Sequence, residues 1–305
     1  MRRKLIQIAG STQLVSLPRE WCKKNNLKKG QELDVVEDGD RILINASSEP
    51  SPEIAKLDIT NFGDMSARCL HALYKKGADE VHVTFKEPSK IQLIQDAIGK
   101  DLVGFEILEQ KEDTCVIRYV SGNIGEFDSL MRRTFLLLLT MANQTYEFLR
   151  DEKYEALKNT AFLEEANNRF TTICRRYLNK SGREITSKVG PLYYIIEELE
   201  KIADQYKYMC QHFYNLKDGK TKLKKNIVAI FGKTCDMIRD FYDAFYKFDP
   251  EKVRRLKNVR NQIVDDAHRM FQKNLSHADY WLIYHTLAIS TKVFGMTGSL
   301  LMLKL

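Results

Sequence analysis

The residues of this sequence with the clearest chemical bias stand near its start. Residues 1–29 carry eight lysines and arginines against one glutamate, whereas residues 30–48 carry five acidic side chains against one arginine. Lysine and arginine gain binding free energy by displacing condensed counterions from phosphates, so a basic face backed by an acidic one orients a protein on a polyanion. We therefore expect this segment to bind duplex DNA. The alternative is a small β-barrel whose lysines only keep it soluble.

Two kinds of polar side chain in this segment suit two parts of a DNA site. Long cationic side chains suit phosphate contacts, whereas amides and hydroxyls suit the edges of bases. The expected phosphate contacts are Arg3, Lys4, Arg19, Lys23 and Lys24. The candidates to reach base edges are Gln7, Ser11, Thr12 and Gln13.

A second chemical pattern lies far downstream, in the segment IIEELEKIADQYKYM. Glu200 and Asp204 stand four residues apart there, so a helix places both carboxylates on one face. Two stacked acids repel each other unless one is protonated, a cationic side chain is near, or a hard metal ion bridges them. Taken alone, the pattern also fits a solvated acidic stripe that pairs with Lys201 or Lys207.

The remaining reactive side chains argue against an enzyme. The six histidines include no pair at metal-ligand spacing, and His285, which stands close to Trp281 and Tyr284, is expected to be a packed core residue. The six cysteines are scattered without a Cys-x-x-Cys pair, as expected for reduced thiols of a cytoplasmic protein. A metal-dependent hydrolase has little support, because no nucleophile, base and oxyanion-binding group converge on the carboxylates.

The basic segment needs strands and a helix to position its side chains. We expect strands over residues 4–9, 12–17, 33–36 and 41–45, an Asp38-Gly39 turn between the last two, and a short helix opening at Pro18. Four strands and one helix in roughly 45 residues are too few to bury a core alone. We therefore predict a homodimer, in which the strands of two copies interleave into a shared barrel.

The landmarks of this segment stand in a specific order, SLPREW, then LKKGQELDVV, then DRILIN. In this order residues 1–48 resemble the SpoVT-AbrB swapped-hairpin DNA-binding domain. That domain has a basic strand, a small polar loop, V-x-L/I-P, a basic helix, L-x-x-G and a closing hairpin. The resemblance implies a small all-β swapped-hairpin barrel with one short helix, which we call the head.

Behind a polar linker, residues 46–52, the sequence predicts a small α/β connector over residues 53–121. Its helices are expected over residues 61–76 and 88–102, and its strands over residues 81–85, 104–109 and 114–120. On one side of the first of these helices we expect Met65, Cys69, Leu70 and Leu73. The longest apolar run of the whole chain, residues 135–142, is too short to span a bilayer, and the start of the chain lacks a signal-like apolar core. We expect a cytoplasmic protein without membrane insertion.

From residue 122 onward the apolar pattern has a helical period. Six long helices are expected, over residues 124–149, 152–179, 187–215, 222–247, 250–274 and 279–303. The pattern Glu-Lys-x-x-x-Leu-Lys-Asn occurs at residues 152–159 and again at residues 251–258, each time at the start of the second helix of three. Residues 122–305 are therefore expected to form an all-α bundle of two tandem three-helix repeats, 122–218 and 219–305.

The two repeats, with LEKIAD in the third helix and EEANNR at residues 164–169 in the second, resemble the PhoU family of phosphate-uptake regulators. In that family, paired carboxylates from facing helices hold iron- or zinc-type metal ions. Archaeal-type members also place an AbrB-type domain and a small α/β segment ahead of the bundle. The resemblance implies a divalent metal site of iron or zinc type in the first repeat, with Glu165, Glu200 and Asp204 as its ligands.

The sequence departs from that family at the expected metal positions. Asn168 stands where the second helix should carry an acid, and Thr291 and Gly295 stand where the second repeat should carry two. Asp236 and Asp240, four residues apart on the fourth helix, fit surface charge. We expect at most one weakly held ion in the first repeat, and an empty site is the open alternative.

These features predict a dimeric transcription regulator of phosphate uptake, in which the head binds operator DNA and the bundle is a sensory or partner-binding module. The alternative is a PhoU-like adaptor that binds no DNA and negatively regulates a phosphate transporter or its ATPase by direct contact. A steep salt dependence of duplex binding distinguishes the regulator from the adaptor.

Overall fold

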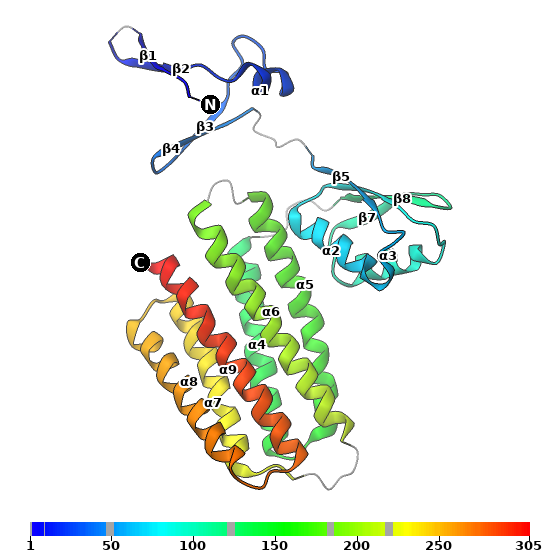
Figure 1. The fold of residues 1–305 in the computed structure, drawn as a ribbon, viewed down its shortest axis with the longest axis vertical. Coiled ribbons are helices and arrows are strands. Elements are labelled where there is room, and N and C mark those ends of the chain that lie inside the picture. The colour runs from blue at the N-terminus through cyan, green and yellow to red at the C-terminus, as the bar shows by residue number, and fades with distance from the viewer. Residues whose placement is uncertain (1, 9, 47–51, 121–125, 182–185, 217–221) are drawn as a thin grey trace. The chain divides into compact units, whose positions relative to one another are not determined.

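The computed structural model of the chain describes residues 2–8, 10–46, 52–120, 126–181, 186–216 and 222–305. The chain forms two compact units, Met1–Pro52 and Glu53–Leu305. The first is a small β-rich domain, and the second contains a small α/β region followed by an all-helical region (Figure 1). The predicted fold class is confirmed. Most of the expected linker and the expected boundaries at residues 122 and 218 lie outside the described residues.

The head consists of two antiparallel hairpins and one short helix. β1 (Leu5–Ile8) pairs with β2 (Thr12–Val15), and β3 (Asp34–Asp38) pairs with β4 (Arg41–Asn45). The helix α1 (Arg19–Lys24) follows Pro18, which has the extended backbone of a helix N-cap. The predicted four strands and one helix are therefore confirmed. Within the described residues the two hairpins form separate sheets.

The α/β region contains a four-stranded sheet with the strand order β5-β6-β8-β7. Its strands are β5 (Ile54–Asp58), β6 (Glu80–Thr84), β7 (Phe105–Gln110) and β8 (Thr114–Tyr119). β5 runs parallel to β6, and the other neighbours are antiparallel. β5 was not predicted, because its alternating pattern is only five residues long and directly follows the polar linker.

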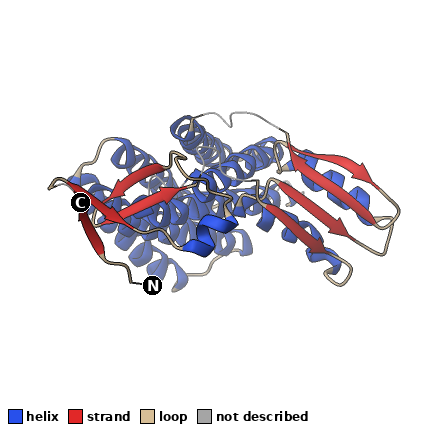
Figure 2. Cartoon of the chain, turned by 90° about the horizontal axis from the view of Figure 1, so that it is seen from above, coloured by secondary structure: helices blue, strands red, loops and turns tan. Residues whose placement is uncertain are grey.

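Two helices, α2 (Ser66–Lys76) and α3 (Lys90–Lys100), lie against one face of this sheet (Figure 2). Along β6, Val81 and Val83 are buried while His82 and Thr84 are exposed, which is the alternation of a sheet covered on one side. Met65 was expected on the apolar side of α2. It lies instead in a 3₁₀ turn before the helix and is 53% exposed.

The helical region has the six predicted helices, which run alongside one another in Figure 1. They are α4 (Phe127–Arg150), α5 (Leu157–Ser181), α6 (Thr186–Asn215), α7 (Lys225–Tyr246), α8 (Pro250–Phe271) and α9 (His277–Lys304). Capping residues define where two of these helices begin. Asp249 caps α8 with Pro250 in the first turn, and Ser276 with Asp279 forms a capping box at α9.

The helix contacts of the bundle repeat with the predicted period of three helices. α4, α5 and α6 all contact one another, and so do α7, α8 and α9. The two sets meet through helices at equivalent positions in the two repeats. The first helices, α4 and α7, pack on each other, and so do the third helices, α6 and α9. One continuous apolar core results, and it contains residues of all six helices.

The helix α9 has a longer apolar stretch than residues 135–142, which were predicted to be the longest apolar run. Among the described residues, α9 alone is long and apolar enough to cross a membrane by length and composition. The same helix packs against α6, α7 and α8, and 39% of its most apolar window is buried. The apolar composition of α9 is therefore also the composition expected of a helix that packs in a protein core.

A buried arginine on α5 joins the α/β region to the bundle. Arg176 is fully buried and donates hydrogen bonds to the carbonyl oxygens of Tyr74 (3.0 Å) and Ala78 (2.7 Å) and to Asp79 Oδ1 (3.1 Å). These acceptors surround the C-terminus of α2, where carbonyl oxygens lack helical partners. At Gly77, which ends α2 with a φ of +107°, an added Cβ would lie 2.7 Å from Lys180 Cγ on α5. Residues 53–305 therefore form one packed unit.

Candidate nucleic-acid interface and the carboxylates of the bundle

The β1–β2 hairpin presents the polar candidates for base contacts. Its strands pair with Gln7 opposite Gln13 and Ile8 opposite Thr12. Gly10 provides the positive φ of +81° that the connecting turn requires. Gln7 Nε2 donates to the carbonyl oxygen of Gly10 at 3.0 Å, so this amide also supports the turn. All four predicted base-contact residues are exposed.

The helix α1 presents a basic surface while its other side is partly covered. Trp21 and Cys22 are half-buried, whereas Arg19, Lys23 and Lys24 are exposed. Lys23 Nζ lies 3.7 Å from Glu20 Oε1, and both side chains are largely exposed, so this pair holds the lysine only weakly. Within the described residues the other predicted phosphate contacts, Arg3, Lys4, Arg19 and Lys24, form no ion pair. These cations are free to meet an external polyanion.

The apolar residues of the head are exposed as well. Leu5 is 69% exposed and Ile6 is 52% exposed, although neighbouring strand residues point to opposite faces. Val35 and Ile42 in the second hairpin are 59% and 65% exposed. None of the described residues between 2 and 46 is buried. A single copy of the head therefore lacks a core, and apolar surface of this extent is typical of a domain completed by another chain.

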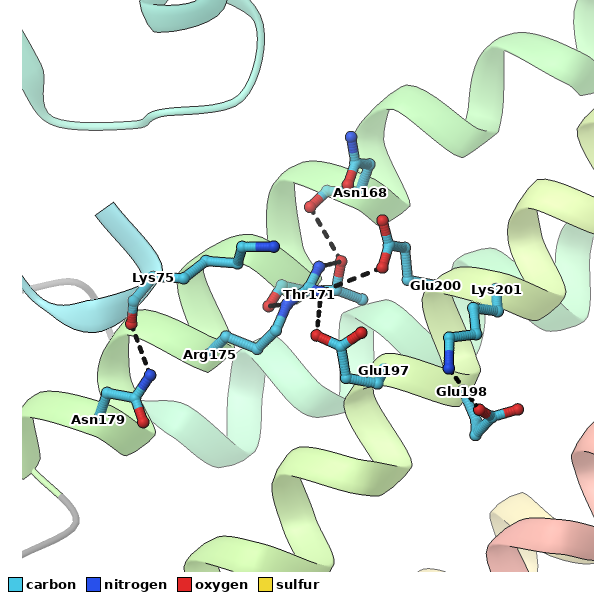
Figure 3. Close-up of polar contacts among 9 residues, drawn as sticks. All are labelled: Lys75, Asn168, Thr171, Arg175, Asn179, Glu197, Glu198, Glu200 and Lys201. Atoms are coloured by element: carbon cyan, nitrogen blue, oxygen red, sulfur yellow. Dashed lines mark hydrogen bonds and ion pairs between the residues drawn. The ribbon is translucent and has the colours of Figure 1, made fainter. Parts of the chain in front are cut away.

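In the bundle, the carboxylate of Glu200 is held by a buried arginine. Arg175 on α5 has a side chain only 1% exposed, and its Nη1 donates to Glu197 Oε1 at 2.5 Å and to Glu200 Oε2 at 3.0 Å (Figure 3). Burial disfavours the charged guanidinium, but Glu200 and Glu197 outweigh that effect and raise the pKa of Arg175. The arginine thus offsets part of the negative charge of Glu197 and Glu200 on α6.

The other two predicted metal ligands also have cationic partners. Asp204 Oδ1 accepts a hydrogen bond from Lys207 Nζ at 2.7 Å, and the same ammonium lies 3.1 Å from Glu164 Oε1. Glu165 instead lies 3.7 Å from Lys100 of α3. The acid of α5 that approaches Asp204 through a shared lysine is therefore Glu164 and not Glu165.

These contacts do not fit the predicted metal site. Within the described part of the chain, no group of three His, Cys, Asp or Glu side chains is placed to hold a metal ion. The guanidinium of Arg175 and the ammonium of Lys207 supply the positive charge that Glu200 and Asp204 need. The expected pairing with Lys207 is confirmed for Asp204, whereas Lys201 lies on Glu198. A sequence signal for this arrangement existed in two consecutive arginines inside the apolar run TTICRRYL, since a buried arginine needs an acidic partner.

In the second repeat, one acid differs from its predicted role. Asp240 was expected to be surface charge, but it is buried on α7 with its Oδ2 3.1 Å from Arg255 Nε. Burial raises the pKa of Asp240, and Arg255 opposes that effect. Asp236 is exposed as expected. No ligand set is formed by this pair.

The histidine predicted to pack in the core does so. His285 is 2% exposed, and its Nδ1 lies 3.1 Å from Gln205 Oε1. Its ring stacks against Trp281 with ring centroids 5.8 Å apart. The six cysteines are free thiols, and four of them are buried.

Comparison with known proteins identifies the class of the first unit alone. Residues 6–53 match the family model described as "Antidote-toxin recognition MazE, bacterial antitoxin". This match fits an N-terminal domain of the MazE/AbrB type, as the hairpins and helix of the head suggested. No curated protein and no solved structure matches the chain. The bundle therefore has no family assignment beyond the resemblance in its sequence.

Proposed function

We propose that this protein is a DNA-binding transcription regulator of the cytoplasm. The observation that carries the proposal is the head: a domain of the MazE/AbrB type with an exposed basic helix and exposed basic residues just before β1. Cations without internal partners lose little on contacting phosphates and release counterions there. The exposed apolar hairpins support binding as an interleaved dimer, which would bring two basic surfaces to one duplex.

The helical region would be the sensory or partner-binding module of this regulator. Its sequence resemblance to the PhoU family supports phosphate uptake as the regulated process. The contacts of three-helix sets through like positions agree with the tandem repeats of that resemblance. We assign the protein no catalytic activity, since its paired carboxylates are bound to arginine and lysine.

A gel-shift series tests the proposal. The intact chain should shift duplex DNA with an affinity that falls steeply between about 50 and 200 mM salt, as a protein with several phosphate contacts does. A chain that begins at Glu53 lacks the head and should not shift DNA under any of these conditions. A shift by that shorter chain would place the DNA-binding surface on the second unit and contradict the proposal.

The adaptor alternative is supported by a different surface. Tyr280, Trp281 and Tyr284 on α9 are 45%, 37% and 54% exposed. Exposed aromatic side chains are enriched where proteins bind other proteins. If the head binds no DNA at low salt, direct binding of a transporter component by this surface becomes the better supported function.

A further inference from the structure

A pocket of about 350 Å³ lies inside the second unit, where the α/β region meets the bundle. Its polar lining comes from three helices: Arg68, His71 and Lys75 of α2, Asn168, Thr172 and Arg175 of α5, and Glu200 of α6. The three residues of α2 are spaced three and four apart, so they share one face of that helix. The walls are fixed, because Asn179 of α5 donates to the carbonyl oxygen of Lys75 at 2.7 Å and Arg176 holds the end of α2.

Two cations of this pocket, Arg68 and Lys75, have no ion-pair partner in the described part of the chain. Among the described residues, the side chains of Arg68 and Lys75 form no hydrogen bond and no ion pair, whereas Arg175 is bound to Glu197 and Glu200. Lys75 is half-buried, and in Figure 3 its side chain extends from α2 towards Arg175 and Thr171. Burial first, and then the charge of Arg175, lower the pKa of Lys75, while Glu197 and Glu200 oppose these effects in part. A half-buried ammonium in this position gains from an anion.

The neutral groups around these cations are hydrogen-bond donors. Burial lowers the pKa of His71 to about 4, and the nearby charges of Lys75, Arg175 and Arg68 add to that effect. At neutral pH the imidazole is therefore uncharged and carries one N–H. The amide of Asn168, at the position where an acid was expected, offers two further N–H groups. Two unpaired cations and neutral donors thus face one small space, and the carboxylate of Glu200, which also lines it, is held by Arg175.

We propose that this pocket binds a small oxyanion of the phosphate type. Arg68 and Lys75 would supply the charge, and His71 and Asn168 would donate hydrogen bonds to its oxygens. The proposal deepens the proposed function by giving the sensory region a ligand. It rests on that function only in treating this region as the sensor of a regulator. The volume is at the lower end of ligand pockets, so it suits inorganic phosphate or a small phosphate ester and not a polymer.

Isothermal titration of the intact chain with inorganic phosphate, at constant ionic strength, tests the site. We expect saturable binding at one site per chain in the wild type. Lys75→Gln should weaken it by at least tenfold, because a charge-assisted hydrogen bond is lost. Arg68→Gln should weaken it less, since Arg68 is exposed. Lys76→Gln, which makes the same charge change at the next residue with a side chain 64% exposed, should bind phosphate as the wild type does.

Two results would overturn the proposal. One is no saturable heat up to about 10 mM of either inorganic phosphate or glycerol 3-phosphate. The other is equal weakening by Lys75→Gln and Lys76→Gln, which would show a diffuse effect of net charge. Titration with both compounds also distinguishes the free ion from an ester as the source of the oxyanion. Duplex binding by the same protein samples is measured separately, so failure of the head and failure of the pocket give different results.

Discussion

Apolar side chains in the two units have opposite environments. In the head, Leu5 and Ile42 are 69% and 65% exposed, whereas Phe135 and Ile195 in the bundle are fully buried. The charged residues show the reverse contrast. Lys24 of the head is exposed, while Arg175 and Arg176 of the second unit are buried with acidic or carbonyl partners. The second unit therefore buries its own apolar cores and pairs its buried arginines internally, whereas the head leaves both its apolar and its cationic groups for other molecules.

The largest effect of this difference should be on folding of the separated units. In a single copy of the head none of the described residues between 2 and 46 is buried, so we expect a fragment of residues 1–52 to lose its strand signal in circular dichroism on dilution. A fragment of residues 53–305 has its own cores and should unfold at a midpoint independent of concentration. A head fragment that is monomeric in sedimentation analysis and unfolds cooperatively would contradict the shared-barrel argument.

The next effect concerns the arginine that joins the two regions of the second unit. Arg176→Met should destabilise residues 53–305 by about 3–5 kcal/mol, because two carbonyl oxygens lose their buried donor and Asp79 is left with Lys180 and the amide of Glu53. Urea denaturation measures the loss, and hydrogen exchange should show α2 opening first. Arg169→Met, which removes an exposed arginine of the same helix, is the matched control and should cost under about 1 kcal/mol. Equal losses in the two variants would show that Arg176 has no special role in joining the regions.

Removal of the neighbouring arginine should uncover the acidic face that resembled a metal site. Arg175→Ala leaves Glu197 and Glu200 without their cation, and we expect a loss of about 2–4 kcal/mol in urea denaturation. Addition of Mn²⁺ should recover part of this stability in the variant and none in the wild type, because carboxylates freed from arginine can bind a divalent ion. If Mn²⁺ stabilises both proteins equally, the ion binds elsewhere.

A smaller change is expected in the affinity of the head for DNA. Lys23→Ala with Lys24→Ala should weaken binding to every duplex by roughly tenfold and flatten the salt dependence by about two units for each protomer on the DNA. Fluorescence anisotropy over a salt series measures both quantities. Lys257→Ala with Lys273→Ala, which removes two exposed lysines of the bundle region, should leave the slope unchanged. An unchanged slope in the head variant would mean that α1 does not face the phosphates.

The same contrast explains which features the sequence predicted. Periodicity and turn residues are local, so the six helices, the β3–β4 hairpin and the burial of His285 were predicted correctly. Partners far apart in the sequence were not. Glu200 and Asp204 do share a helix, but only the packing of α5 against α6 decides that Arg175 takes Glu200 and that Lys207 links Asp204 to Glu164. The pocket beside Arg175 was also invisible, since its lining combines residues more than a hundred positions apart.

The smallest predicted effect is a dependence of stability on pH that belongs to the second unit alone. Burial, and then the nearby His212, lower the pKa of His285 from 6.5 to about 4. Between pH 6.5 and about pH 4 the imidazole is therefore protonated in the unfolded chain but not in the folded chain. The free energy of unfolding falls as the pH drops through that window. Acidification from pH 7 to pH 5 should remove about 1–2 kcal/mol through this residue.

In the variant His285→Asn, which can keep a hydrogen bond to Gln205, the fall in stability on acidification should be smaller by that amount. The exposed His268 of α8 provides the control, because His268→Gln should leave the wild-type dependence intact. Urea denaturation of residues 53–305 at several pH values measures all three proteins. Parallel curves for His285→Asn and the wild type would show that the protonated imidazole is accommodated in the fold. The pH dependence would then have to come from other buried groups, such as His71 in the oxyanion pocket.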